Sequence, residues 1–141
     1  MKILVAVDGS KSSLHAVQYA CKLAVGLRTK DRITLLSVHD DHGLRHAKQF
    51  VGKAEIQDYL RAESEQDLKA AHKHLTKAGV AFDTIIKQGH VAQEIIQLAN
   101  SGKFDLVVVG SKGRSGLADL LLGSVAQRVI AAAKPPVVVV K

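Results

Sequence analysis

Cysteine, tryptophan and proline are scarce in this sequence, which has one Cys, no Trp and 2 Pro. A single cysteine, Cys21, excludes an intrachain disulfide and fits the cytoplasm. No apolar run approaches the roughly 20 residues that a membrane-spanning helix needs. The residues after Met1 include no small-residue cleavage site, so no signal peptide is expected. We therefore expect a cytoplasmic protein that does not insert into membranes.

Aromatic residues are also few, with 3 Phe and 2 Tyr. They are not interleaved with basic residues, as a platform for stacking nucleic-acid bases would require. The net charge of +7 is compatible with nucleic acid, anionic lipid or phosphate ligands, but a solvated surface explains it as well. The sequence therefore predicts no nucleic-acid partner.

What is present is a set of five short apolar runs in a chain of 141 residues, a length typical of a single domain spanning residues 1–141. The runs are Ile3–Val7, Ile33–Val38, Phe82–Ile86, Leu106–Val109 and Val137–Val140. The first, fourth and fifth are continuous rather than alternating, which is typical of strands buried on both faces.

The segments between these runs carry apolar residues at steps of three and four, which predicts helices. These stripes begin at Leu14, Tyr59, Ala92 and Val125. Ser10 is a plausible N-cap for the first helix, and Gly26, Gly79 and Gly102 stand where helices would stop. The alternation of strands and helices predicts an α/β fold, a doubly wound parallel sheet with helices on both faces.

A glycine-rich stretch joins the fourth predicted strand to the last predicted helix, with the spacing Gly110-x2-Gly113-x9-Gly123-Ser124. Chance would produce three glycines and a hydroxyl at such spacing in about 0.6% of sequences of this composition. Glycine permits positive φ and close approach of a ligand, and a helix start attracts phosphate. The alternative is a glycine-rich connection without chemical role.

Each part of this loop has an expected task. Gly110 turns the chain off the strand, and Gly113 presents its N–H to a phosphate. Gly123 and Ser124 stand at the start of the last helix, where Ser124 either binds phosphate or caps the helix.

Basic and hydroxyl side chains lie within the same loop. Lys112, Arg114 and Ser115 are close enough in sequence to add charge and hydrogen bonds to a phosphate. The loop is not a P-loop, because Gly-x4-Gly-Lys-Ser/Thr is absent. We predict a nucleotide-binding protein, with ATP as the nucleotide.

Two other polar segments allow more than one interpretation. Asp8, followed by Gly9 and Ser10, is either an ordinary turn residue or a ligand contact that also helps to hold Mg²⁺. Residues 40–53, with the histidines around them, form no strong zinc pattern, so a polar surface loop is favoured and no metal site is predicted. Cys21 falls on the apolar stripe of the first helix and is assigned to the core.

The glycine spacing resembles the ATP-binding signature of the universal stress protein family, in its ATP-binding class. Ile3–Ser10 resembles the family's first strand and acidic turn, Leu35–Val38 its second strand and Pro136–Val140 its last. The resemblance covers the whole chain, and the glycine spacing is its most specific part.

This resemblance implies a five-stranded Rossmann-like sheet of order 3-2-1-4-5, usually dimeric, with ATP between the first strand tip and the glycine loop. It places Asp8 against the nucleoside and the backbone of Val38 against adenine, while Lys112 occupies a variable position. The resemblance further implies that the nucleoside side is lined by Ala6, Val7 and Asp8. It implies that ribose and phosphates are surrounded by Gly110, Gly113, Gly123, Ser124 and Val125.

Three functions are consistent with these features. The first is an ATP-binding regulatory protein of the stress response, whose nucleotide occupancy modulates a homodimer or an unknown protein partner. The second is a slow ATPase or ATP-dependent transferase, for which no general base or acceptor site is identified. The third is an interaction module in which Val137–Val140 forms a terminal strand at the sheet edge and pairs with its symmetry mate. The sequence leaves open the stress, the partner, ATP hydrolysis, and preference among ATP, ADP and AMP.

Overall fold

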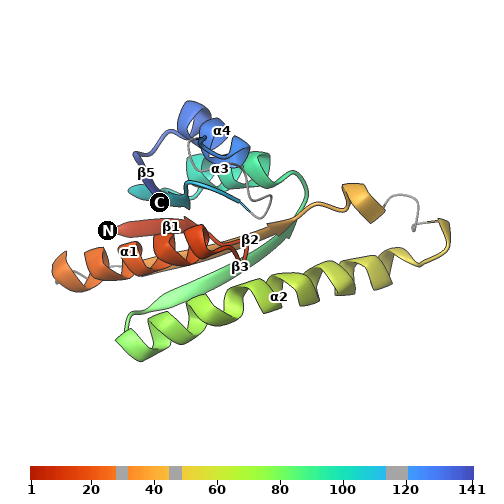
Figure 1. Ribbon diagram of the computed structural model, residues 1–141, viewed down its shortest axis with the longest axis horizontal. Helices are drawn as coiled ribbons and strands as arrows, with labels where there is room; N and C mark the ends of the chain where they lie inside the picture. Colours follow the sequence, from red (N-terminus) through yellow and green to blue (C-terminus); the bar gives the residue numbers. More distant parts are fainter. Residues whose placement is uncertain (28–31, 45–48, 114–120) are drawn as a thin grey trace.

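The computed structural model describes residues 1–27, 32–44, 49–113 and 121–141. Its centre is a parallel five-stranded sheet of order β3-β2-β1-β4-β5, which confirms the predicted fold class and strand order (Figure 1). The strands are β1 (Lys2–Ala6), β2 (Arg32–His39), β3 (Phe82–Gln88), β4 (Leu106–Gly110) and β5 (Val137–Val140).

In the described residues, four α-helices connect these strands, as the apolar spacing predicted. They are α1 (Lys11–Leu27), α2 (Lys53–Ala78), α3 (Val91–Ser101) and α4 (Ser124–Ala132). Helices α1 and α2 cover one face of the sheet, and α3 and α4 cover the other (Figure 1). Within the described ranges, none of the helices combines the length and apolar character needed to cross a membrane.

The core consists of two layers, one on each face of the sheet. Along β1, Ile3 and Val5 pack against α1 and α2, whereas Leu4 between them packs against α3 and α4. All three side chains are fully buried. The continuous apolar run of β1 is explained by this arrangement, because successive side chains point to opposite faces and both faces are covered.

Strand β5 differs from this description, and the expectation that Val137–Val140 is buried on both faces is wrong. All four of its residues are only partly buried. The strand lies at the edge of the sheet and pairs with β4 alone among the described strands. The predicted position of this strand at the sheet edge is thus confirmed, whereas its apolar run overstated its burial.

The predicted helix ends are confirmed at some residues and not at others. Ser10 caps α1, since its Oγ accepts a hydrogen bond of 3.1 Å from the Ser13 N–H. Gly79 ends α2 in the left-handed conformation with φ of 69°. Gly26 is no stop, because α1 continues through it to Leu27. Gly102 follows α3 with φ of −86°, so it ends the helix without a left-handed cap.

The structure also tests the expectations for Cys21 and for the segment 40–53. Cys21 lies in the core between α1 and the sheet, as predicted, and burial raises the pKa of its thiol. The segment 40–53 is not a plain loop, because His42–Leu44 forms a short 3-10 helix, η1, and α2 begins at Lys53. Residues 45–48 of that segment lie outside the described residues.

The strand order places a crevice at one end of the sheet. From β1 the chain crosses to β2 and β3 on one side, and later returns to β4 on the other side of β1. Ligands in such sheets bind beyond the carboxyl ends of the strands where the order reverses. Here that point lies between the end of β1, near Asp8, and the end of β4, at Gly110.

Candidate functional site

A cavity of about 390 Å³ opens at this switch point. It is bounded by the ends of β1, β2 and β4, by α3, and by the start of α4. The predicted site residues that line it are Ala6, Val7, Asp8, Val38, Gly110, Lys112, Gly113, Gly123, Ser124 and Val125. The remaining predicted residue, Arg114, lies outside the described residues, as does Ser115.

Several lining residues were missed by the sequence reasoning. They are Ser13, Leu36, Asp40, Val91, Ile95, Val109 and Ala126. Part of the signal was present in the sequence: Val91 and Ile95 are one helical turn apart, and Asp40 stands two residues after Val38 in an extended segment. The sequence alone could not show that α3 lies over the end of β2, which is what brings these residues to the cavity.

The two sides of the cavity differ in chemistry. Towards β2 and α3 the wall is apolar at Val38, Val91 and Ile95, and Asp40 is the one charged residue there among the described lining residues. Towards β4 and α4 it carries the glycines, Lys112 and the first residues of α4. This side suits an anion, because the N–H groups of a first helical turn have no acceptor within the helix and the helix dipole favours negative charge.

The two ends of the glycine loop lie side by side and are tied to their surroundings. The Gly123 N–H donates to the Ser111 carbonyl at 2.7 Å, and the Ser111 N–H donates to the Val140 carbonyl at 2.8 Å. The Lys112 N–H donates to Ser12 Oγ at 3.2 Å. The base of the loop is therefore fixed against both α1 and β5.

The N-cap of α4 is Gly123, with φ of −59° and ψ of 151°, and no side chain caps the helix. Ser124 is the first residue of α4 rather than its cap, so the capping alternative for Ser124 is wrong. Its N–H and hydroxyl belong to the helical turn that lines the cavity. Ser124 is thus placed where the anion-binding interpretation requires it.

The glycines of the loop are needed for space rather than for positive φ. Among the described glycines, positive φ occurs at Gly9, Gly79 and Gly89, and not at the three loop glycines. A Cβ on Gly113 would lie 3.3 Å from Asp8 Oδ2, and one on Gly123 would lie 3.2 Å from the Ser111 carbonyl oxygen. The expected positive φ is therefore absent at these glycines, and the close contacts they make are with the protein's own atoms.

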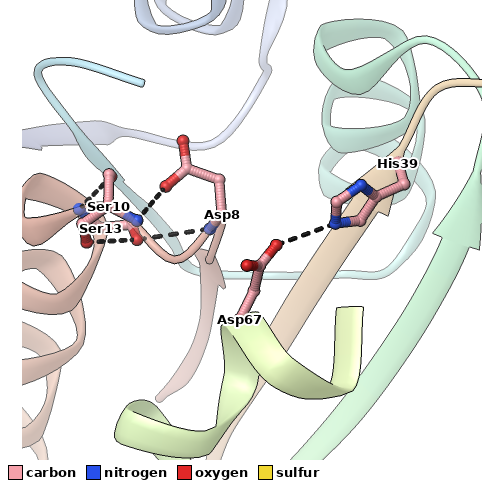
Figure 2. A network of polar contacts seen from close by, with 5 residues as sticks. All are labelled: Asp8, Ser10, Ser13, His39 and Asp67. Carbon is pink, nitrogen blue, oxygen red and sulfur yellow. Dashed lines mark hydrogen bonds and ion pairs between the residues drawn. The ribbon is translucent and has the colours of Figure 1, made fainter. Parts of the chain in front are cut away.

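Asp8 adopts the turn that the sequence allowed, and it also lines the cavity. Its Oδ1 accepts a hydrogen bond of 2.9 Å from the Ser10 N–H, which is an ordinary Asx turn (Figure 2). The same side chain lines the cavity, and its Oδ2 is the atom nearest to a Cβ built on Gly113. The turn therefore orients the carboxylate towards the glycine loop.

A polar pair behind this turn was not anticipated. His39 Nε2 lies 2.8 Å from Asp67 Oδ2, which joins β2 to α2 (Figure 2). Asp67 Oδ1 would lie 2.5 Å from a Cβ on Gly9, whose φ is 82°. Gly9 therefore meets two requirements, a left-handed backbone and room for the Asp67 carboxylate.

The doubly wound sheet, with a cavity at its switch point facing a glycine loop and a helix start, defines a Rossmann-like α/β protein. A model of the universal stress protein family matches residues 1–141, and the chain belongs to this family.

Individual relatives agree with this assignment. Universal stress protein MJ0531 of Methanocaldococcus jannaschii is 37% identical, with 99% of this chain and 81% of the relative covered. The solved structure of MJ0577 from the same organism has a TM-score of 0.85 at 28% identity, covering 99% of this chain and 94% of that chain. A universal stress protein solved in complex with cAMP has a TM-score of 0.74 at 26% identity, covering 100% and 97%.

Proposed function

We propose that the chain binds an adenine nucleotide, ATP with Mg²⁺, in the switch-point cavity, and that nucleotide occupancy modulates its interactions as a stress-response regulator. The observation that carries this proposal is the convergence of the glycine loop, the start of α4 and an apolar wall on one cavity. A family relative of similar fold binds cAMP, an adenine nucleotide, which supports the same ligand class.

The apolar side of the cavity suits a nucleoside. The whole cavity has a volume of about 390 Å³, which falls within the range of small-molecule sites. Val38, Val91 and Ile95 offer aliphatic surface to the faces of a base. Apolar walls with a few polar groups are the usual construction of a ligand pocket.

The glycine side suits the phosphates. Helix α4 has 9 residues and points its amino end at the cavity, so its first N–H groups and its dipole favour an anion. Side chains at Gly113 or Gly123 would crowd this space, as the positions of a built Cβ indicate. Lys112, a cationic residue, also lines this side of the cavity.

The carboxylate of Asp8 is placed to help hold Mg²⁺. This cation usually keeps several waters and takes one or two carboxylates together with phosphate oxygens. Asp8 lines the cavity opposite Gly113, next to the part assigned to the phosphates. When bound, Mg²⁺ would neutralise phosphate charge, while Asp8 holds the cation and the glycine loop holds the phosphates.

The first test is calorimetric titration of the purified, nucleotide-free chain with MgATP. We expect saturable binding near one ATP per chain. Absence of binding would mean that the glycines only shape the loop, and the interaction-module interpretation would then take precedence. Repeating the titration with ADP and AMP would establish how many phosphates the site recognises.

We also propose that β5 pairs with its symmetry mate in a homodimer. The Val107 and Ser111 N–H groups donate to the carbonyls of Pro136 and Val140, so alternate residues of β5 turn their backbone groups towards β4. The backbone groups of Val137 and Val139 then point outwards, where they can pair with another strand.

Light scattering at micromolar concentration is expected to give twice the chain mass of 15.1 kDa. Val139→Pro should shift the protein towards the monomer, because proline removes an outward N–H from the edge strand. Val139→Thr keeps that N–H and serves as the control. A monomeric wild-type protein, or a Val139→Pro variant as dimeric as the control, would contradict pairing through β5.

A further inference from the structure

Asp40 is a polar side chain on the otherwise apolar side of the cavity. It follows β2 directly and stands two residues after Val38, so the two share a face of the extended chain. The intervening residue, His39, points to the opposite face and contacts Asp67 of α2. Asp40 thereby lines the cavity together with Val38, Val91 and Ile95.

The Asp40 carboxylate is held in place from two directions. Its Oδ1 accepts a hydrogen bond of 2.9 Å from the His42 N–H. Its Oδ2 lies 3.2 Å from Nδ1 of His90, the residue at the N-cap of α3. The carboxylate is about one-third exposed, with a side-chain exposure of 31%. These contacts fix its orientation at the rim without burying it.

This arrangement leaves acceptor capacity on both oxygens. A carboxylate offers about four acceptor positions, and the two contacts use one position on each oxygen. On the side of the cavity formed by β2 and α3, Asp40 is the one charged residue among the described lining residues. A ligand group that reaches Asp40 must therefore donate hydrogen bonds. If the ligand presented an acceptor instead, neither that acceptor nor the carboxylate oxygen would have a hydrogen-bond donor, which is unfavourable.

We propose that Asp40 determines base specificity by accepting a hydrogen bond from the exocyclic amino group of adenine. The inference rests on the proposed function, since it assumes that the base lies on the apolar side of the cavity. Hypoxanthine carries an oxygen where adenine carries this amino group. That oxygen would face the carboxylate, so the site disfavours ITP although its ribose and phosphates are identical to those of ATP.

The matched pair of ATP and ITP tests this assignment by calorimetry. For the wild-type chain we expect MgATP to bind about tenfold to a hundredfold more tightly than MgITP, the range that one hydrogen bond to a charged group supports. Asp40→Asn should bring the ratio of the two affinities near one. The amide oxygen still accepts from the His42 N–H, while the amide nitrogen can donate to the oxygen of hypoxanthine.

The distinguishing result is a gain of ITP affinity in Asp40→Asn together with a loss of ATP affinity. A purely structural role of Asp40 would weaken both nucleotides alike. Asp40→Ala, which offers neither donor nor acceptor, should lose ATP preference with a smaller gain of ITP affinity than Asp40→Asn, because it relieves the repulsion but donates no hydrogen bond. Asp58→Asn makes the same chemical change on the exposed surface of α2 and should leave the ratio at the wild-type value.

Three outcomes would overturn the proposal, and they can be told apart. If wild type binds ATP and ITP equally, the assignment of Asp40 is wrong while nucleotide binding stands. If wild type discriminates but Asp40→Asn discriminates equally, another group reads the base. If neither nucleotide binds wild type, the proposed function fails, and the role of Asp40 fails with it. Melting temperatures of all variants establish that each is folded.

Discussion

A Gly123→Val variant is expected to bind MgATP at least about a hundredfold more weakly than wild type, which corresponds to about 2.7 kcal/mol. The backbone at Gly123, with φ of −59° and ψ of 151°, accepts any residue, so the fold should persist. The added side chain, however, would begin 3.2 Å from the Ser111 carbonyl oxygen and 3.4 Å from Lys112 Cα. It would displace the part of the loop assigned to the phosphates.

The chain contains a matched control for this experiment. Gly52 is the N-cap of α2, with φ of −63° and ψ of 151°, and it too has no side-chain cap. A Cβ on Gly52 would meet nothing within 4 Å. Gly52→Val should therefore bind MgATP like wild type in the same calorimetric titration. Wild-type affinity in Gly123→Val would contradict the site, and an equal loss in both variants would indicate a general effect of valine before a helix.

The second large effect concerns stability. Gly110→Ala is expected to lower the free energy of unfolding by about 3 kcal/mol and the melting temperature by about 10 °C. Its Cβ would lie 2.6 Å from Ser12 Oγ, 2.7 Å from Ser12 C and 2.8 Å from Ser13 N. Two of these atoms are backbone, so α1 would have to move away from β4. Urea denaturation measures the loss.

Gly26→Ala provides the opposite case. Gly26 lies inside α1, and a Cβ there would meet nothing within 4 Å. Alanine is the better helix former, so this variant should be more stable than wild type by about 0.5 kcal/mol. If Gly110→Ala were as stable as Gly26→Ala, the close packing of β4 against the start of α1 would not be the reason for glycine at position 110.

The fold could be predicted because its signals are local. Strands buried between two helical layers read as continuous apolar runs, as Ile3–Val7 does, and the helices carry apolar stripes at their own period. The edge position of Val137–Val140 was predicted from the resemblance, whose strand order 3-2-1-4-5 is confirmed, and not from the apolar run itself. A run of valines is the same whether a strand has one neighbour or two, and only the strand order distinguishes these cases.

The candidate site was predictable where it follows the chain and not where it depends on packing. The loop from Gly110 to Ser124 is continuous in sequence, so its spacing could be recognised. The pair formed by His39 and Asp67 joins residues on different elements and left no local pattern. Ile95 resembles any core residue of an amphipathic helix until α3 is placed beside β2.

The arrangement of the neighbouring residues His39 and Asp40 determines which sequence changes the end of β2 can accept. Because they face opposite layers, substitutions at one need not disturb the contacts of the other. A deletion of one residue from β2 would act on both at once, since it reverses the faces of everything that follows. Asp40 would then turn towards Asp67, and two carboxylates would oppose each other behind Gly9. The end of β2 therefore tolerates substitutions far better than changes of length.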